Sequence, residues 1–149
     1  MSTKYNGTPE ENRALDAFIK FYRAASSLKT RIDRHQPNGT LSESQFGTLE
    51  MLLHLGPLNQ KAIGEKLLIS KSNVVSIIDK LEQRGLVRRQ RCQDDRRNIY
   101  VHLTDSGRET IQEIMPIHVA AIVEEMGCLT AVEQEELGRL CRKLGLKDA

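Results

Sequence analysis

Apolar residues recur at intervals of three and four along much of this chain, and the spacing predicts a mainly helical protein. The first helix is predicted from Pro9 to about His35, and the turn residues Pro37-Asn38-Gly39 end it. The polar residues 1–8 in front of it are expected to be disordered. The apolar stripe of this helix consists of Leu15, Phe18, Ile19, Tyr22, Ala25, Leu28 and Ile32.

Three shorter helices are predicted next, and a capping residue opens each of them. Ser42-Glu43-Ser44-Gln45 is a capping box for a helix that runs through about Leu55. Asn59 caps a helix over residues 60–67, and a tight turn at Leu68-Ile69 separates it from a helix over residues 71–83. Two short helices joined by a tight turn are typical of a helix-turn-helix, whose second helix enters the major groove of DNA.

The helix over residues 71–83 has one apolar and one polar face. Val74, Ile77, Ile78 and Leu81 lie on the side that is expected to be buried. Hydroxyl, amide and lysine groups on the other side can meet base edges, and the backbone N–H groups of a helix N-terminus favour a phosphate. The candidate DNA contacts of this recognition helix are Ser70, Lys71, Ser72, Asn73, Ser76 and Lys80.

A basic β-hairpin is predicted directly after this helix. Gly85 ends the helix and Leu86-Val87 begin the first strand, while Ile99, Val101 and Leu103 alternate with more polar neighbours in the second. The tip over residues 93–98 is too strongly charged to be buried. A helix followed by an arginine-rich hairpin can present positive charge to both grooves of a DNA duplex.

Charge is distributed unevenly along the 149 residues, although the net charge is only +2. Between Lys71 and Arg97 there are eight basic and four acidic residues, whereas from Glu109 onward there are eight acidic and four basic residues. The basic segment is therefore a candidate polyanion-binding surface, and a solvated charged face is the alternative interpretation.

Two more helices complete the predicted fold, which is mainly α with a small β wing (α+β). Thr104 caps a long helix over residues 105–126, and Pro116 is expected to kink this helix without ending it. Thr130-Ala131-Val132-Glu133 is a capping box for a final helix through about Leu144. No apolar run approaches the roughly 18 residues of a membrane span.

Gly85-Leu86-Val87-Arg88-Arg89, Asp94-Asp95-Arg96-Arg97 and Val101-His102-Leu103-Thr104-Asp105-Ser106-Gly107 together resemble the wing of the MarR family of winged helix-turn-helix regulators. The segment from Ser72 to Glu82 is similar to the recognition helix of that family. The resemblance extends from about Glu10 to Leu144 and includes the proline inside the long helix.

The resemblance implies a homodimer whose terminal helices interleave and whose two wings grip DNA. It further implies that Arg97 enters the minor groove, that Asp95 orients it, and that Arg96 contacts a phosphate or pairs with Asp94. An arginine in a narrow minor groove is favoured by the negative potential there. The candidate wing contacts are Arg88, Arg91, Asp95, Arg96 and Arg97.

Two residues depart from the pattern of the family. Leu68 stands in the turn where many members carry glycine. Ile77 stands on the recognition helix where many carry a basic residue, which lowers the number of major-groove contacts expected of that helix.

We expect residues 9–36 and 105–149 to form a helical dimerisation region and residues 40–104 to form the winged helix-turn-helix region. The terminal helices carry more apolar surface than a small winged domain can bury, and a dimer suits a palindromic DNA site. Packing of both helices on the winged core is the alternative. The candidate dimerisation residues are Leu15, Phe18, Ile19, Tyr22, Ile114, Ile122, Leu137, Leu140 and Leu144.

Small-molecule sensing is common in the resembled family, with a pocket between the dimer helices and the winged lobe. The candidate pocket residues are Phe21, Tyr22, Arg23, Met51, His54 and Leu55, and ordinary core packing is the alternative for each. Cys92 lies near the wing arginines and is a candidate redox switch, since positive charge favours the thiolate. The three cysteines and four histidines lack metal-ligand spacing, so no metal and no cofactor are predicted.

These features predict a cytoplasmic, ligand-responsive repressor that binds a pseudo-palindromic operator as a homodimer. Its expected partners are double-stranded DNA, a second copy of the chain and a small-molecule effector, with no membrane. No nucleophile–base pair or phosphate loop points to an enzyme. The alternative function is a winged-helix module that binds protein or coats DNA without sequence choice, and the alternative signal is cysteine oxidation.

Overall fold

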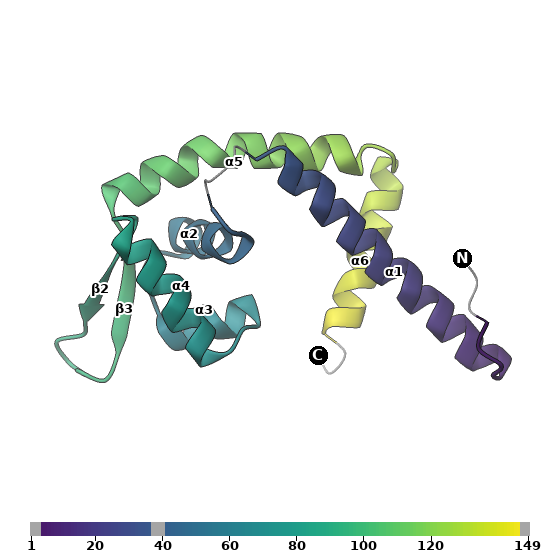
Figure 1. The fold of residues 1–149 in the computed structure, drawn as a ribbon, viewed down its shortest axis with the longest axis horizontal. Coiled ribbons are helices and arrows are strands. Elements are labelled where there is room, and N and C mark those ends of the chain that lie inside the picture. Colours follow the sequence, from purple (N-terminus) through teal and green to yellow (C-terminus); the bar gives the residue numbers. More distant parts are fainter. Residues whose placement is uncertain (1–3, 37–40, 147–149) are drawn as a thin grey trace. The chain divides into compact units, whose positions relative to one another are not determined.

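The computed structural model describes residues 4–36 and 41–146, and it is mainly helical with a small antiparallel sheet (Figure 1). This confirms the predicted fold class. The turn predicted at Pro37-Asn38-Gly39 lies outside the described residues. The elements in order are α1 (Pro9–Arg34), α2 (Glu43–Leu55), β1 (Leu58–Asn59), α3 (Gln60–Leu67), α4 (Lys71–Gln83), β2 (Val87–Arg91), β3 (Ile99–Leu103), α5 (Asp105–Met126) and α6 (Ala131–Gly145).

The chain divides into two compact units. The helical unit consists of residues 1–36 and 118–149, and the winged unit consists of residues 37–117. The division therefore falls inside α5, after Ile117, and the first half of that helix belongs to the winged unit. Of the segment 1–8 that we expect to be disordered, residues 1–3 lie outside the described residues, and Thr8 caps α1.

Capping side chains start the helices where the sequence predicts them. Ser42 accepts a hydrogen bond from the backbone of Gln45, and Asn59 accepts one from Ala62. Ser70 and Thr130 do the same for α4 and α6, and the box at Thr130 is complete. Such a cap contributes about 1 kcal/mol by satisfying a backbone N–H that has no partner within the helix.

One hydrophobic core holds the winged unit together and positions α4. Leu49 of α2, Ile63 of α3, Ile78 of α4 and Val101 of β3 are all completely buried in it. Ile114 of α5 belongs to the same core and is only 6% exposed. Its assignment to the dimer interface is therefore corrected, because its side chain is already packed inside one chain.

A third strand was missed by the sequence analysis. β1 pairs antiparallel with β3 through Leu58 opposite Val101, and the sheet order is β1-β3-β2. β1 has only two residues, too few for alternation to show. At the base of the wing, β1 therefore covers the edge of β3 that does not pair with β2.

The tight turn between α3 and α4 forces Leu68 into the left-handed region, with φ 56° and ψ 41°. This is the position at which the sequence departs from the glycine of its resembled family. The Leu68 side chain is 91% exposed, so it gains little burial in return for a conformation that favours glycine.

In the helical unit, an ion pair links Arg31 of α1 to Glu125 of α5, and His35 lies 3.7 Å from the same carboxylate. These contacts, with the hydrogen bond of Arg31 as the largest cause, hold the pKa of Glu125 below its usual value. In the described part of the chain, no single helix is long and apolar enough to cross a membrane. α5 and α6 meet the length and composition criteria only as a pair bent by 104°.

Candidate nucleic-acid interface

α4 has a polar face that the winged core leaves exposed to solvent. Val74, Ile78 and Leu81 anchor its other side in the core. Ile77 is partly buried against that core, so this departure from the family pattern contributes to packing. The predicted contacts on this helix are all exposed: Ser70, Lys71, Ser72, Asn73, Ser76 and Lys80.

The N-terminus of α4 gathers small polar groups. Ser70 Oγ accepts a hydrogen bond from the backbone of Asn73 at 3.4 Å and lies 3.3 Å from Ser72 Oγ. Lys71 is the first residue of the helix and is exposed beside them. Helix N-termini favour anions because their N–H groups point outward, so this end of α4 suits a phosphate.

β2 and β3 form the predicted hairpin next to α4 (Figure 1). Arg88 pairs with His102 across the ladder, and its guanidinium donates a hydrogen bond to Gln90 Oε1 at 3.0 Å. Burial and, secondarily, the charge of Arg88 hold the pKa of His102 below its usual 6.5. Arg88 and Arg91 are both exposed, as a DNA contact requires.

Asp95 shapes the tip of the wing. Its carboxylate accepts a hydrogen bond from the backbone N–H of Arg97 at 3.0 Å and one from the Asn98 amide at 3.4 Å, while its carbonyl accepts from the Asn98 backbone at 3.0 Å. Arg96 and Arg97 are exposed on the turn that these bonds close. Within the described residues, no ion pair joins Arg96 to Asp94.

Arg89, which the sequence analysis did not single out, behaves differently from the other wing arginines. Its side chain is 21% exposed and forms ion pairs with Asp79 at 2.6 Å and Glu82 at 3.0 Å. It also donates a hydrogen bond to Gln60 Oε1 at 2.8 Å. The alternation along β2 was the available signal, because Arg89 faces the same side of the strand as buried Val87.

The base of the wing is joined closely to the start of α5. The hydroxyl of Thr104 donates to the carbonyl of Gly85 at 2.6 Å and accepts from the backbone of Gly107 at 3.0 Å. A Cβ atom at Gly107 would lie 1.9 Å from the Leu86 carbonyl oxygen. Only glycine fits this approach, which gives a physical reason for the glycine in the resembled wing pattern.

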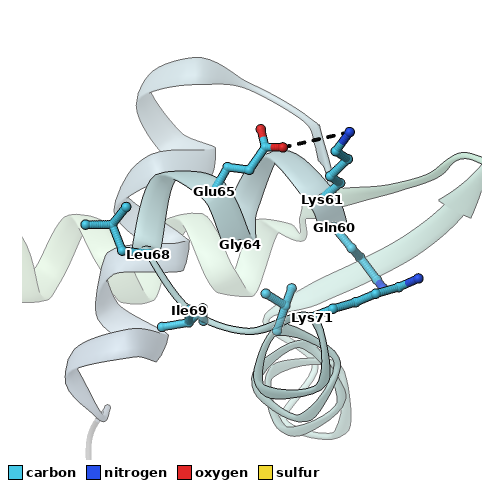
Figure 2. Close-up of a pocket in the computed structure, with 8 residues that line it drawn as sticks. Gln60, Lys61, Gly64, Glu65, Leu68, Ile69 and Lys71 are labelled. Carbon is cyan, nitrogen blue, oxygen red and sulfur yellow. Dashed lines mark ion pairs between the residues drawn. The ribbon is translucent and has the colours of Figure 1, made fainter. Parts of the chain in front are cut away.

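A shallow groove of about 660 Å³ lies between α3 and the start of α4 (Figure 2). Gly64, Ile69 and Val74 contribute to its apolar lining, and Lys61 and Lys71 lie at its edge. It contains none of the residues predicted to form a ligand pocket. The predicted pocket residues come from both units of the chain, and their pocket therefore stays a prediction. One of them, Phe21, lines a groove between α1 and α6.

The predicted chemistry of the cysteines is not tested by the structure. Cys92 is half-buried just after β2, and its backbone N–H donates to the Asn98 carbonyl at 3.0 Å. Cys128 is exposed and Cys141 is half-buried. Among the described residues, no group of three or more histidine, cysteine or acidic side chains is placed to hold a metal ion.

Comparison with known proteins identifies the family. The MarR family model matches residues 41–99, which span the interface described above. The HTH-type transcriptional regulator YkoM of Bacillus subtilis is 35% identical over 137 residues, covering 92% of this chain and 89% of YkoM. The chain belongs to the MarR family. The HTH-type transcriptional regulator MhqR of the same organism is 31% identical over 134 residues, covering 90% of this chain and 92% of MhqR.

Solved MarR structures share the fold over nearly the whole chain. Sco3205 of Streptomyces coelicolor, solved in complex with DNA, has a TM-score of 0.82 and 25% identity, covering 95% of this chain and 90% of Sco3205. AbsC of the same organism has a TM-score of 0.83 and 21% identity, with 95% and 96% of the two chains covered. The protein is therefore a transcriptional regulator with the MarR winged-helix fold.

Proposed function

We propose that this MarR-family regulator is a repressor that binds a pseudo-palindromic operator as a homodimer. The observation that carries the proposal is the pairing, in one compact unit, of the exposed polar face of α4 with a wing tip closed by Asp95. The first fits the major groove, and the second presents Arg97 to the minor groove beside it. The DNA complex of Sco3205, a protein 25% identical, supports this assignment.

The exposed apolar surface of the helical unit supports the proposed dimer. Phe18 and Tyr22 stack on each other with their ring centroids 6.2 Å apart, yet they are 62% and 63% exposed. An apolar groove of about 360 Å³ runs between α1 and α6 and is lined by Phe18, Leu137, Leu140 and Leu144, among others. A second copy of these helices can bury this surface, since in a two-fold symmetric interface the same patch of both copies is covered.

We further propose that a small molecule regulates DNA binding by shifting a conformational equilibrium, without a catalysed reaction. Regulation of DNA binding by 6-hydroxynicotinic acid is described for BpsR of Bordetella bronchiseptica, which shares the fold with a TM-score of 0.80. The predicted residues Tyr22, Arg23, Met51, His54 and Leu55 are the positions to probe for such a ligand. The proposed location is the cytoplasm, because a regulator of this kind acts where the chromosome lies.

Binding-site selection from a random duplex library tests the proposal. The expected product is a two-fold symmetric consensus with half-sites about one helical turn apart, because two recognition helices related by symmetry read it. Recovery of bound duplexes without a consensus sequence contradicts the proposal and favours the non-specific module.

A further inference from the structure

Arg89 is the one arginine of β2 whose guanidinium points into the winged unit. Its side chain is 21% exposed, whereas Arg88 and Arg91 on the same strand are exposed to solvent. Strand alternation turns Arg88 away from the side of buried Val87, while Arg89 and Arg91 both face that side. Of these two, Arg89 is the one whose guanidinium pairs with Asp79 and Glu82 of α4. A side chain placed this way is poorly available to a DNA phosphate.

The donors of this guanidinium are directed at acceptors of the protein itself. Nε donates to Gln60 Oε1 at 2.8 Å, Nη1 donates to Glu82 Oε1 at 3.0 Å, and Nη2 lies 2.6 Å from Asp79 Oδ1. Nη2 also donates to the Val75 carbonyl at 3.4 Å. Two carboxylates thus compensate one guanidinium, and charge-assisted bonds of this kind are stronger than neutral ones.

These bonds connect three elements of the DNA-binding unit. Gln60 begins α3, Asp79 and Glu82 lie in the second half of α4, and Arg89 lies in the middle of β2. Glu82 holds the strand twice, because its other oxygen accepts the backbone N–H of Arg89 at 2.9 Å. The rigid planar fork of arginine converts such a set of acceptors into a fixed geometry, which a flexible lysine cannot do.

We propose that Arg89 is a positioning residue for operator recognition, an inference that rests on the proposed function. It holds β2 at a fixed distance and angle from α4 and does not contact DNA. Arg89 pairs with Val101 of β3, so the placement of β2 is passed to both strands that carry the wing tip. The recognition helix and Arg97 can then enter adjacent grooves together, because the wing is already held in place and loses little conformational entropy when DNA binds.

The variant Arg89→Lys tests the proposal because it retains the charge and removes the fork. We expect operator affinity to fall about tenfold to a hundredfold, as for the loss of well-placed bonds to charged groups. We expect affinity for random DNA and the dependence of operator affinity on salt to stay as in the wild type, since no phosphate contact is lost. The matched control is Arg139→Lys in α6, which removes an equivalent arginine fork paired with Glu136 outside the DNA-binding unit, and a change of less than about threefold is expected.

Three results overturn the inference. Operator affinity within about twofold of the wild type shows that the fork is dispensable. For Arg89→Gln, which removes the charge that Arg89→Lys keeps, a salt slope reduced by about one shows that Arg89 contacts a phosphate directly. An equal loss on operator and random DNA shows general destabilisation, which thermal unfolding of the variant confirms independently.

A distance measurement without DNA separates this inference from the proposed function. Spin labels at Ser76 on α4 and Gln93 at the wing, in a chain with its cysteines replaced by serine and diluted with unlabelled protein, report the geometry within one chain. We expect a narrow distance distribution for the wild-type residue and a broader one for Arg89→Lys. Equal distance distributions in the wild type and Arg89→Lys overturn the positioning role even if the protein binds its operator. A wild type without operator preference refutes only the proposed function.

Discussion

Asp95 accepts a hydrogen bond from the backbone N–H of Arg97, with 3.0 Å between Arg97 N and Asp95 Oδ1. The bond lies within a three-residue turn and leaves the guanidinium of Arg97 exposed. An acidic residue at a DNA-binding tip therefore shapes the loop, and the repulsion it exerts on phosphate is offset by the ordering it provides.

This relationship predicts the outcome of a double-mutant cycle. Arg97→Ala is expected to lower operator affinity about tenfold or more, with the loss concentrated on AT-rich flanks where the minor groove is narrow. Asp95→Ala is expected to cause part of that loss, and the double variant is expected to bind no worse than Arg97→Ala, because Asp95 acts through Arg97. Fluorescence anisotropy with operator duplexes measures all four proteins.

Arg139→Ala provides the control, since this exposed arginine of α6 pairs with Glu136 in the helical unit. Its operator affinity is expected to match the wild type. Additive losses for Asp95→Ala and Arg97→Ala argue that the carboxylate acts independently of the wing arginine.

Dimer formation is expected to depend on the apolar groove between α1 and α6. Leu140 lines this groove and is 48% exposed, so Leu140→Glu places a charge where the second copy packs and is expected to give monomers. Val132→Glu, at a 75% exposed residue in the first turn of α6, is the control and is expected to remain dimeric. Light scattering distinguishes the chain mass of 16.9 kDa from twice that value, and a dimeric Leu140→Glu protein with native helicity refutes this interface.

Leu68→Gly is expected to stabilise the protein by about 0.5–1 kcal/mol. Leucine in the left-handed region destabilises the folded state by about 1–2 kcal/mol. Glycine removes this strain but increases the conformational entropy of the unfolded chain, and this second effect is somewhat smaller. Little burial is lost because the side chain is 91% exposed. Lys66→Gly, two residues earlier inside α3, is the control and is expected to destabilise by about 1 kcal/mol. Denaturant unfolding compares the two, and destabilisation by Leu68→Gly shows that the leucine makes a compensating contact.

Stability is expected to depend on the protonation of His102. Its pKa is lowered in the folded state, first by burial and then by the charge of Arg88, so the unfolded chain binds the proton more readily. The free energy of unfolding is therefore highest above pH 6.5 and decreases as the pH falls from 6.5 to the lowered pKa, below which this contribution is constant.

The measurement is the free energy of unfolding of the wild type and of His102→Gln between about pH 7.5 and about pH 5. The wild type is expected to lose more stability on acidification than the variant, which carries no titrating group at this position. His54→Gln, at an exposed residue of α2, is the control. A wild-type protein that gains stability relative to His102→Gln on acidification shows that the pKa is raised instead.

Much of the fold could be predicted from the sequence because its signals are local. Ser42, Asn59, Ser70 and Thr130 cap helices through bonds to residues three positions away, and helical periodicity shows which face of α4 is buried. The two-residue β1 could not be predicted, since its only support is pairing with the distant β3.

Residues of the candidate site could be predicted where their role depends on exposure. They could not be predicted where their role depends on a partner far away in the sequence. Arg88, Arg96 and Arg97 are exposed as expected, whereas only the alternation with Val87 indicated that Arg89 faces the core side of β2. Its role depends on Gln60, 29 residues away, and on acidic residues that were counted only as opposing charge. Ile114 was misassigned for a similar reason, because periodicity shows that a residue is buried but not which partner buries it.

The ratio of operator to random-duplex affinity, measured at physiological salt, tests the central claim most directly. A homodimer that reads bases with α4 and the minor groove with Arg97 is expected to prefer its selected operator by about a thousandfold or more, as specific DNA-binding proteins do. A preference below about tenfold contradicts the claim, because phosphate contacts alone then account for the binding.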